Sequence, residues 1–297
     1  MAGIALPQQL EAPIKGTSLW RDAARRLMRN PAALVGLFLV LGFIFVAIFA
    51  PLISPYDPTS GTILQRFRPP SSIHLLGTDL QGRDILSRIM WGARSSLWVS
   101  ILSVSIGLTL GLSFGAVSGF VGGWVDFWMM RAVDVMLSLP GLLLTITIVL
   151  FLGPGLNTIA FAIAIENVPI FARLVRSSIL GLKESDFVLA ARSVGASDKR
   201  ILLQHVMPNA LTPVIVQATL ALATAIVDAA GLGYLGFGPQ DPSTPEWGTM
   251  LTDTQRYLTS GAAYTALFPG IAIILAVLGF NLLGDGLREA LDPRLKR

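Results

Sequence analysis

The stretch "AALVGLFLVLGFIFVAIFAPLI" (residues 32–53) decides the fold class, because it carries no charged side chain over its whole length. The hydrocarbon core of a membrane is about 30 Å thick, and roughly 20 helical residues are needed to cross it. An apolar run of this length therefore predicts a membrane-spanning helix. It begins only at residue 32 and is longer than the apolar part of a signal peptide, so we expect a retained span and no cleaved leader.

The composition of the whole chain agrees with a membrane protein. Of its 297 residues 53% are hydrophobic and 13% are charged, whereas a soluble domain carries about 25% charged residues. There is no cysteine, which excludes disulfides and cysteine metal sites, and the two histidines, His74 and His205, lie too far apart to suggest a metal site. The net charge of +4 comes from residues that flank apolar runs, so we expect no nucleic-acid partner.

Five further apolar runs follow the first one along the chain. They lie at about residues 97–121, 132–152, 156–174, 210–232 and 262–283, and Pro140 is expected to kink the second of them. The sequence therefore predicts an all-α polytopic membrane protein with six transmembrane helices. Its segments are predicted as an N-terminal segment (1–33), a first transmembrane helix (34–53), an extracytoplasmic loop (54–96), a five-helix core (97–285) that includes a polar loop (185–208), and a tail (286–297).

The distribution of basic residues predicts the orientation in the membrane. Of the 22 lysines and arginines, 16 fall on the side of the two termini, and cytoplasmic segments carry an excess of such residues. Both termini and the polar loop at 185–208 are therefore predicted to be cytoplasmic. Near the N-terminus, "TSLWRDAARRLMRNP" (17–31) predicts a short helix capped at Thr17 or Ser18, which either lies along the inner leaflet or is a solvated basic tail.

The polar segment "FVLAARSVGASDKRILLQHVMPN" (187–209) interrupts the apolar pattern. Ser185 or Asp186 can cap a first helix, and Gly195 can end it in the left-handed conformation. Ser197 can cap a second helix, which Pro208 is expected to stop. Small and apolar residues share one face of each helix. The physical pattern leaves two interpretations open, a helix-in-groove contact with a partner or a loop that folds back on its own spans.

This segment resembles the cytoplasmic coupling loop of binding-protein-dependent ABC importer permeases. The family pattern is Glu-Ala-Ala, three residues, Gly, nine residues, Ile, one residue and Leu-Pro. Here Ala190, Ala191, Gly195 and Pro208 match in register, while Leu189 replaces the glutamate and His205 replaces the isoleucine. The resemblance implies an ATPase-docking role for Phe187, Ala190, Ala191, Arg192, Gly195, Ile201, His205 and Pro208.

Three more stretches resemble the C-type permease of the dipeptide, oligopeptide and nickel branch of these importers. They are "HLLGTDLQGRDILSRIMWGARSSLWVS" (74–100), "LGYLGFGPQDPSTPEWGTML" (232–251) and "GDGLREALDPRL" (284–295), and the similarity covers residues 34–297. The resemblance implies a type I ABC importer permease fold in a bacterial or archaeal inner (plasma) membrane. It also implies a second, B-type permease, two ABC ATPase subunits and an extracytoplasmic substrate-binding protein as partners.

The chain itself has no phosphate loop of the G-x-x-x-x-G-K-[ST] type. It is therefore expected to be a transport subunit without enzymatic activity or cofactor of its own, with ATP and magnesium bound by the partner ATPases. In the outer loops the resemblance implies docking of the binding protein, although a simple lid over the pathway is equally open. The residues concerned are Gly77, Thr78, Asp79, Gly82, Arg83, Asp84 and Trp247.

Glu166 lies inside the fourth apolar run, where a charge in lipid is costly. Three roles stay open for it: contact with the ammonium group of a peptide cargo, pairing with a neighbouring subunit, or a position near the membrane edge. Short peptides are the predicted cargo, with nickel or glutathione as alternatives. An ion-coupled secondary transporter is the rival class, but the chain lacks the related halves expected of one.

Overall fold

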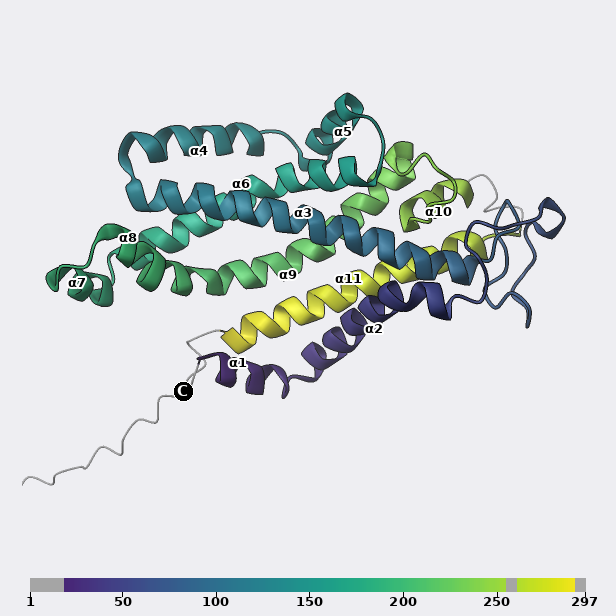
Figure 1. Cartoon of the computed structure of the whole chain (residues 1–297), viewed down its shortest axis with the longest axis horizontal. Coiled ribbons are helices and arrows are strands. Elements are labelled where there is room, and N and C mark those ends of the chain that lie inside the picture. The colour runs from purple at the N-terminus through teal and green to yellow at the C-terminus, as the bar shows by residue number, and fades with distance from the viewer. Residues whose placement is uncertain (1–18, 255–260, 292–297) are drawn as a thin grey trace, which may run out of the picture.

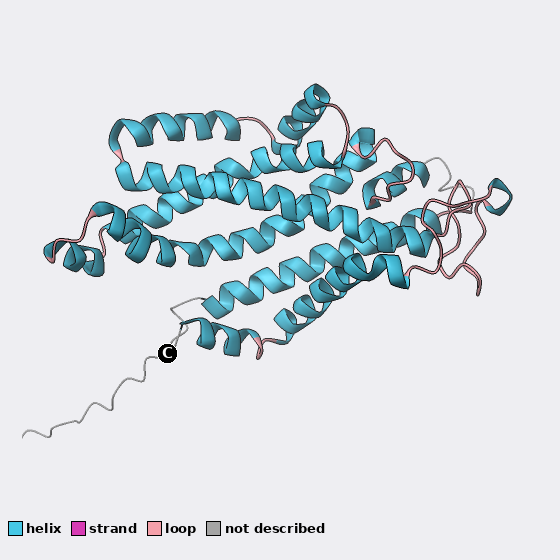
Figure 2. Cartoon of the chain, viewed as in Figure 1, coloured by secondary structure: helices cyan, strands magenta, loops and turns pink. Residues whose placement is uncertain are grey.

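The computed structural model describes residues 19–254 and 261–291, and within these ranges the regular structure is helical (Figure 2). The only β pairing among the described residues is in two isolated bridges, Gly61 with Arg83 and Thr78 with Asp84. Five continuous helical stretches are long and apolar enough to cross a membrane, and a sixth span is possible if a bent helix pair counts as one. The long helices that make up these five stretches are α2 (Pro31–Ile53), α3 (Ile85–Val121), α6 (Leu156–Lys183), α9 (Met207–Leu232) and α11 (Tyr264–Leu291).

The third predicted span is not one straight helix. Residues 132–152 belong to α4 (Gly123–Leu137) and α5 (Gly141–Leu152), whose axes are bent by 89° at the intervening break. Pro140 is the N-cap of α5 with an extended ψ of 130°, and proline has no backbone N–H with which to continue the preceding helix. The kink expected at Pro140 is therefore a complete break between two helices.

The second span begins earlier than predicted. Asp84 caps α3, and its carboxylate accepts a hydrogen bond of 2.8 Å from the Ser87 N–H. Residues 85–96, predicted as part of an extracytoplasmic loop, therefore form the first turns of the 37-residue helix α3. At the other extreme of the chain α11 continues to Leu291, so the described part of the predicted tail is helical.

Figure 1 shows that the long helices run side by side and that shorter helices and loops lie at two ends of the bundle. One end, called here the α7 end, holds α1 (Leu19–Leu27), α7 (Asp186–Ser193) and the last residues of α11. The opposite end, called the loop end, holds residues 54–84 and α10 (Trp247–Thr254). The predicted N-terminal helix is thus confirmed as α1, whereas its predicted caps, Thr17 and Ser18, lie outside the described residues.

A ladder of glycines on α3 holds it against α6. Gly107, Gly111, Gly115 and Gly119 recur every four residues and are buried along this contact. A Cβ atom at Gly107 would lie 2.9 Å from the Ala164 carbonyl oxygen, and one at Gly119 would lie 3.1 Å from that of Arg176. Small residues at this spacing allow two helix backbones to approach closely in lipid. Large side chains on the outer surface stay exposed, such as Phe38 (77%) and Phe151 (84%), as expected for a surface in contact with lipid.

Candidate functional site

The polar segment at the α7 end forms two helical pieces joined at Gly195. Ser185 is the N-cap of α7, and Gly195 follows the helix with a φ of +81°. The Ala196 N–H donates to the Ala191 carbonyl at 3.0 Å, and the Gly195 N–H donates to the Arg192 carbonyl at 2.9 Å. This pair of bonds is a Schellman motif, which needs a left-handed residue at the position of Gly195. The predicted glycine ending of the first helix is confirmed.

The second piece does not stop at Pro208. It begins at Ser197, the N-cap of α8 (Asp198–Arg200), and continues through the π-helical turns of η2 (Ile201–Val206) directly into α9. The Met207 N–H donates to the Leu202 carbonyl, five residues earlier. Such wide turns are one way in which a helix accommodates a proline that lacks an N–H. The predicted stop at Pro208 was therefore wrong, and the second piece runs without a break into the spanning helix α9.

Three buried side chains anchor the segment to the bundle. Val188, Ile201 and Val206 are each 0% exposed and belong to the central apolar cluster, with Ala191 packed against it. Ile201, predicted as a docking residue, is thus an anchor and cannot contact a partner in this conformation. Ala191 and His205 are half-buried. The predicted residues that remain exposed are Phe187, Ala190, Arg192, Gly195 and Pro208.

The exposed surface of this segment carries one weak ion pair. Arg192 and Asp198 approach to 3.6 Å between Nη2 and Oδ1, and both side chains are largely exposed. Val194, next to Gly195, is 84% exposed, and Leu189 is 52% exposed. An apolar surface held in the open by buried anchors is suited to contact with another protein.

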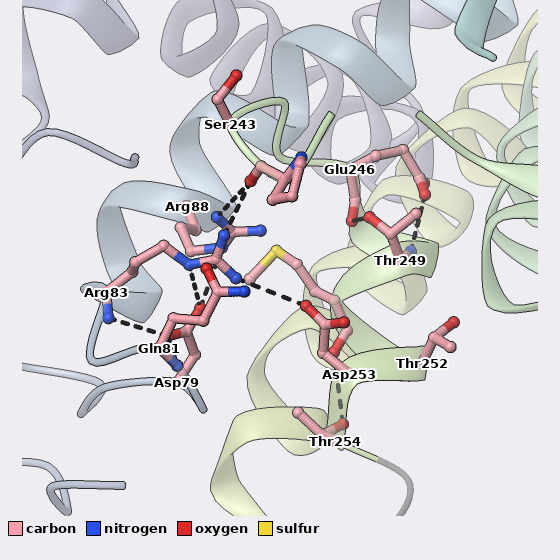
Figure 3. A network of polar contacts seen from close by, with 12 residues as sticks. Asp79, Gln81, Arg83, Arg88, Ser243, Glu246, Thr249, Thr252, Asp253 and Thr254 are labelled. Atoms are coloured by element: carbon pink, nitrogen blue, oxygen red, sulfur yellow. Dashed lines mark hydrogen bonds and ion pairs between the residues drawn. The ribbon is translucent and has the colours of Figure 1, made fainter. Parts of the chain in front are cut away.

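The loop end contains a buried network of charges, shown in Figure 3. Arg83 Nε lies 2.7 Å from Asp79 Oδ2, and Arg88 Nε lies 3.5 Å from the same oxygen. Arg83 also donates from Nη1 to the Pro242 carbonyl at 2.8 Å, and its Nη2 lies 3.5 Å from Asp253 Oδ2. These contacts connect the first outer loop to the loop before α10 and to α10 itself.

A second set of bonds fixes the turn that leads into α3. Asp84 accepts from the Ser87 hydroxyl at 2.8 Å and lies 2.9 Å from His74 Nδ1. Thr78 has no exposed surface, and its hydroxyl donates to the Gln65 carbonyl at 2.5 Å. Gly77 and Gly82 have φ values of +81° and +76°, which glycine adopts readily.

Trp247 and Glu246 fix the start of α10. Trp247 is fully buried, and its Nε1 donates to the Ile89 carbonyl at 3.1 Å. The Glu246 carboxylate accepts hydrogen bonds of 2.8 Å from the backbone N–H groups of Gly248 and Thr249. Burial raises the pKa of Glu246 to about 7, and the two hydrogen bonds oppose that rise. Burial likewise raises the pKa of Asp253.

The predicted docking residues of the outer loops are therefore buried. Exposure is low at all seven, namely Gly77, Thr78, Asp79, Gly82, Arg83, Asp84 and Trp247. They hold the loop end together and are buried in this conformation, so the role of these residues in docking stays a prediction. The exposed apolar side chains of the same loop are Ile63 (75%), Leu64 (88%), Ile73 (63%) and Leu75 (60%). Whether such side chains are exposed depends on which distant segments of the chain cover the loop. The periodicity of the sequence alone therefore could not have identified them.

Beside the charge network a polar cavity of about 270 Å³ opens between the two outer loops. Arg88, Asp253 and Gln240 are among its lining residues. Its walls can form hydrogen bonds but contain no nucleophile paired with a base.

Glu166 lies on α6 against the break between α4 and α5. Its carboxyl group lies directly against Gly141, the first residue of α5, so a side chain at position 141 would require Glu166 to move. Among the described residues, Glu166 Oε2 is buried and has no hydrogen-bond partner. The same part of the chain holds no ion-pair partner for Asp228, the acidic residue on α9. By contrast, Asp126 on α4 pairs with Arg176 on α6 through two bonds of 2.6 Å.

These features define a helical membrane protein with a rigid polar projection at one end and a structured outer loop at the other. Comparisons with known proteins agree. Residues 107–297 match the family described as "Binding-protein-dependent transport system inner membrane component", and residues 18–70 match "N-terminal TM domain of oligopeptide transport permease C". The chain belongs to the family of binding-protein-dependent transport system inner membrane components, as the sequence resemblance predicted.

Relatives are similar over nearly the whole chain. The dipeptide transport system permease protein DppC of Escherichia coli K12 is 48% identical, and the alignment covers 100% of both chains. DppC of Alkalihalophilus pseudofirmus is 48% identical over 94% of this chain and 91% of its own. The glutathione transport system permease protein GsiD of Salmonella typhimurium is 46% identical over 99% and 94%.

A solved structure supports the fold. A chain of the methionine ABC transporter MetNI, in inward-facing conformations, aligns with a TM-score of 0.56 and 19% identity. The alignment covers 70% of this chain and 96% of that one. The protein is thus a multi-pass inner-membrane permease subunit with the fold of ABC importers.

Proposed function

We propose that this permease forms half of the pathway by which an ATP-driven importer takes up short peptides, with dipeptides as the principal cargo. The observation that carries this proposal is the 48% identity to a dipeptide permease over the full length of both chains. A second candidate cargo is glutathione, itself a short peptide, because a glutathione permease is 46% identical over nearly the same length. A single cargo-binding chemistry could serve both.

Uptake measurements distinguish the two cargoes. The chain is produced with its B-type permease, two ATPase subunits and binding protein in proteoliposomes, and uptake of a labelled dipeptide and of labelled glutathione is compared. ATP-dependent dipeptide uptake that excess glutathione does not inhibit is the expected result. Uptake of glutathione alone transfers the assignment to the second candidate, and uptake driven by an ion gradient without ATP contradicts the importer mechanism.

The exposed surface of α7 is proposed to dock into an ATPase subunit on the cytoplasmic side. Buried anchors at Val188 and Ile201 and the continuous passage of η2 into α9 support this role, because movement at α7 would be passed directly to a spanning helix. Ala190→Asp places a charge in the middle of this surface, and we expect the ATPase subunits to dissociate and uptake to stop. Ser177→Asp adds the same charge at an exposed position of α6, outside the α7 segment, and serves as the matched control. Equal behaviour of the two variants would refute the docking role.

The binding protein is proposed to dock on the exposed apolar residues of the first outer loop. Leu64 and Ile63 lie on the short helix η1 (Ile63–Gln65), and the buried charge network beneath holds the loop in place. Leu64→Asp is expected to weaken binding-protein association without reducing the stability of the permease. Normal association in this variant would exclude the surface.

Glu166 is proposed as a pathway contact for the ammonium group of a peptide. Its buried, unpartnered oxygen at the α4–α5 break supports this role, since a carboxylate inside a membrane protein calls for a cation. Glu166→Gln keeps the shape and removes the charge. Uptake of a normal dipeptide should fall at least about tenfold, as expected for one lost charge-assisted bond of about 1.5–3 kcal/mol. An N-acetylated dipeptide, which lacks the ammonium, should be insensitive to the change.

A further inference from the structure

A cavity of about 480 Å³ lies at the α7 end where α1 meets α11. Its lining includes Arg26 on α1, and Arg29 and Asn30 just after that helix. Glu289 and Ala290 of α11 line the other side. Two membrane-spanning helices terminate here, because α2 begins at Pro31 and α11 ends at Leu291. The cavity therefore lies at the boundary between the hydrocarbon and the water.

Close packing fixes the position of the two arginines relative to the spans. Gly286 on α11 allows this approach, because a Cβ there would lie 3.3 Å from Leu27 Cδ1 and would collide with Ala33. Ala23 and Ala290 are 8% and 7% exposed. The cavity is consequently built by packed helices and is not an accidental gap beside a loose tail.

The described lining of the cavity carries a net positive charge. Among the residues that the structure describes, the guanidinium groups of Arg26 and Arg29 have no hydrogen-bond or ion-pair partner. The single carboxylate of the lining, Glu289, accepts a hydrogen bond of 2.6 Å from Asn30 Nδ2 and is one negative charge against two positive ones. The described lining therefore carries an excess of positive charge.

From this geometry we infer that the cavity binds the phosphate-containing headgroup of an anionic phospholipid. A basic pocket at the ends of spanning helices suits such a headgroup, with each nearby arginine contributing about 1 kcal/mol. Pro31, Gly286 and Ala290 provide apolar walls, and Met28 beside the pocket is 60% exposed, so an acyl chain can follow the outer surface of α2 and α11. The bound lipid fixes α1 at the end of the bundle.

The test uses the full-length chain purified in detergent with its co-purifying subunits, titrated with phosphatidylglycerol and observed by native mass spectrometry. We expect Arg26→Gln/Arg29→Gln to weaken binding of the first phosphatidylglycerol at least about tenfold, from the contribution of two arginines. The matched control is Arg25→Gln/Arg288→Gln, which removes two exposed charges that do not line the cavity. The inference would be overturned if both double variants weakened phosphatidylglycerol binding equally. It would also be overturned if neither of them weakened it.

Two measurements on the unmodified protein complete the test and do not depend on the variants folding. Phosphatidylcholine, which has a phosphate but no net charge, should bind at least about tenfold more weakly than phosphatidylglycerol. Excess inorganic phosphate should not displace the lipid. Displacement by phosphate would assign the cavity to a free anion, and equal binding of the two lipids would show that the arginines do not select charge.

Discussion

The two polar ends of this permease use similar residue types in opposite ways. At the loop end Asp79, Arg83 and Arg88 are buried and paired with one another. At the α7 end Arg192 and Asp198 pair at 3.6 Å while largely exposed. Charge in the first region holds two distant segments together, whereas charge in the second lies on a surface whose stability comes from apolar anchors.

This contrast shows that a motif rich in charged and glycine residues does not by itself reveal a contact surface. The buried network of the loop end depends on Pro242, which lies 159 positions away from Arg83 in the sequence. The surface open to a partner consists instead of apolar residues such as Leu64 and Val194.

Removing one member of the buried network is the strongest test of the contrast. Arg83→Leu leaves Asp79 with a weakened set of partners, and we expect a loss of about 3–5 kcal/mol of stability, since unpaired buried charges are costly. Thermal unfolding of the purified complex measures the loss. Arg66→Leu, an exposed arginine of the same loop, is the control and should cost within about 0.5 kcal/mol. Similar costs for both variants would show that the network is dispensable.

The pH dependence of the loop end is expected to come from Glu246. Burial raises its pKa to about 7 from an ordinary value of 4.5, so the folded protein binds this proton more tightly than the unfolded chain does. Stability should therefore be highest below pH 4.5, fall as the pH rises towards 7, and level off above it, by an amount on the order of 3 kcal/mol. Hydrogen exchange of α10 across this range measures the effect. Glu246→Gln should flatten the profile, and an unchanged slope would assign the titration to another group.

The apolar anchor of the α7 end should have an intermediate effect. Val188→Ala removes two buried methyl groups and is expected to cost about 2 kcal/mol locally, seen as faster hydrogen exchange in α7. Leu189→Ala, its exposed neighbour, is the control and should leave exchange unchanged. Slower exchange of α7 than of α9 in the Val188 variant would contradict the anchoring role.

The smallest effect is expected for the exposed ion pair. Arg192→Gln should change stability by about 0.2–1 kcal/mol, and less at high salt, because exposed pairs are screened. A double-mutant cycle with Asp198→Asn isolates the pair energy. A coupling as large as that of the buried network would remove the distinction between the two ends.

Features governed by local chemistry could be predicted from the sequence, and those governed by distant contacts could not. The cap at Ser185, the left-handed Gly195 and the existence of several apolar spans follow from neighbouring residues and were confirmed. The complete break at Pro140, the passage of the chain through Pro208 and the burial of Ile201 depend on how separate helices pack. The burial of the outer-loop residues could not be predicted for the same reason, because the environment of Asp79 is built by segments far along the chain.

The glycine ladder between α3 and α6 limits how the two helices can shift. Their backbones interlock at every fourth residue from Gly107 to Gly119, so sliding one past the other would force backbone atoms to collide. The two helices must therefore tilt together as one rigid unit. One end of this unit leads from α6 towards α7, and at the other end α3 starts at the buried charge network. A displacement at α7 would thus reach the opposite end of the protein through this pair of helices.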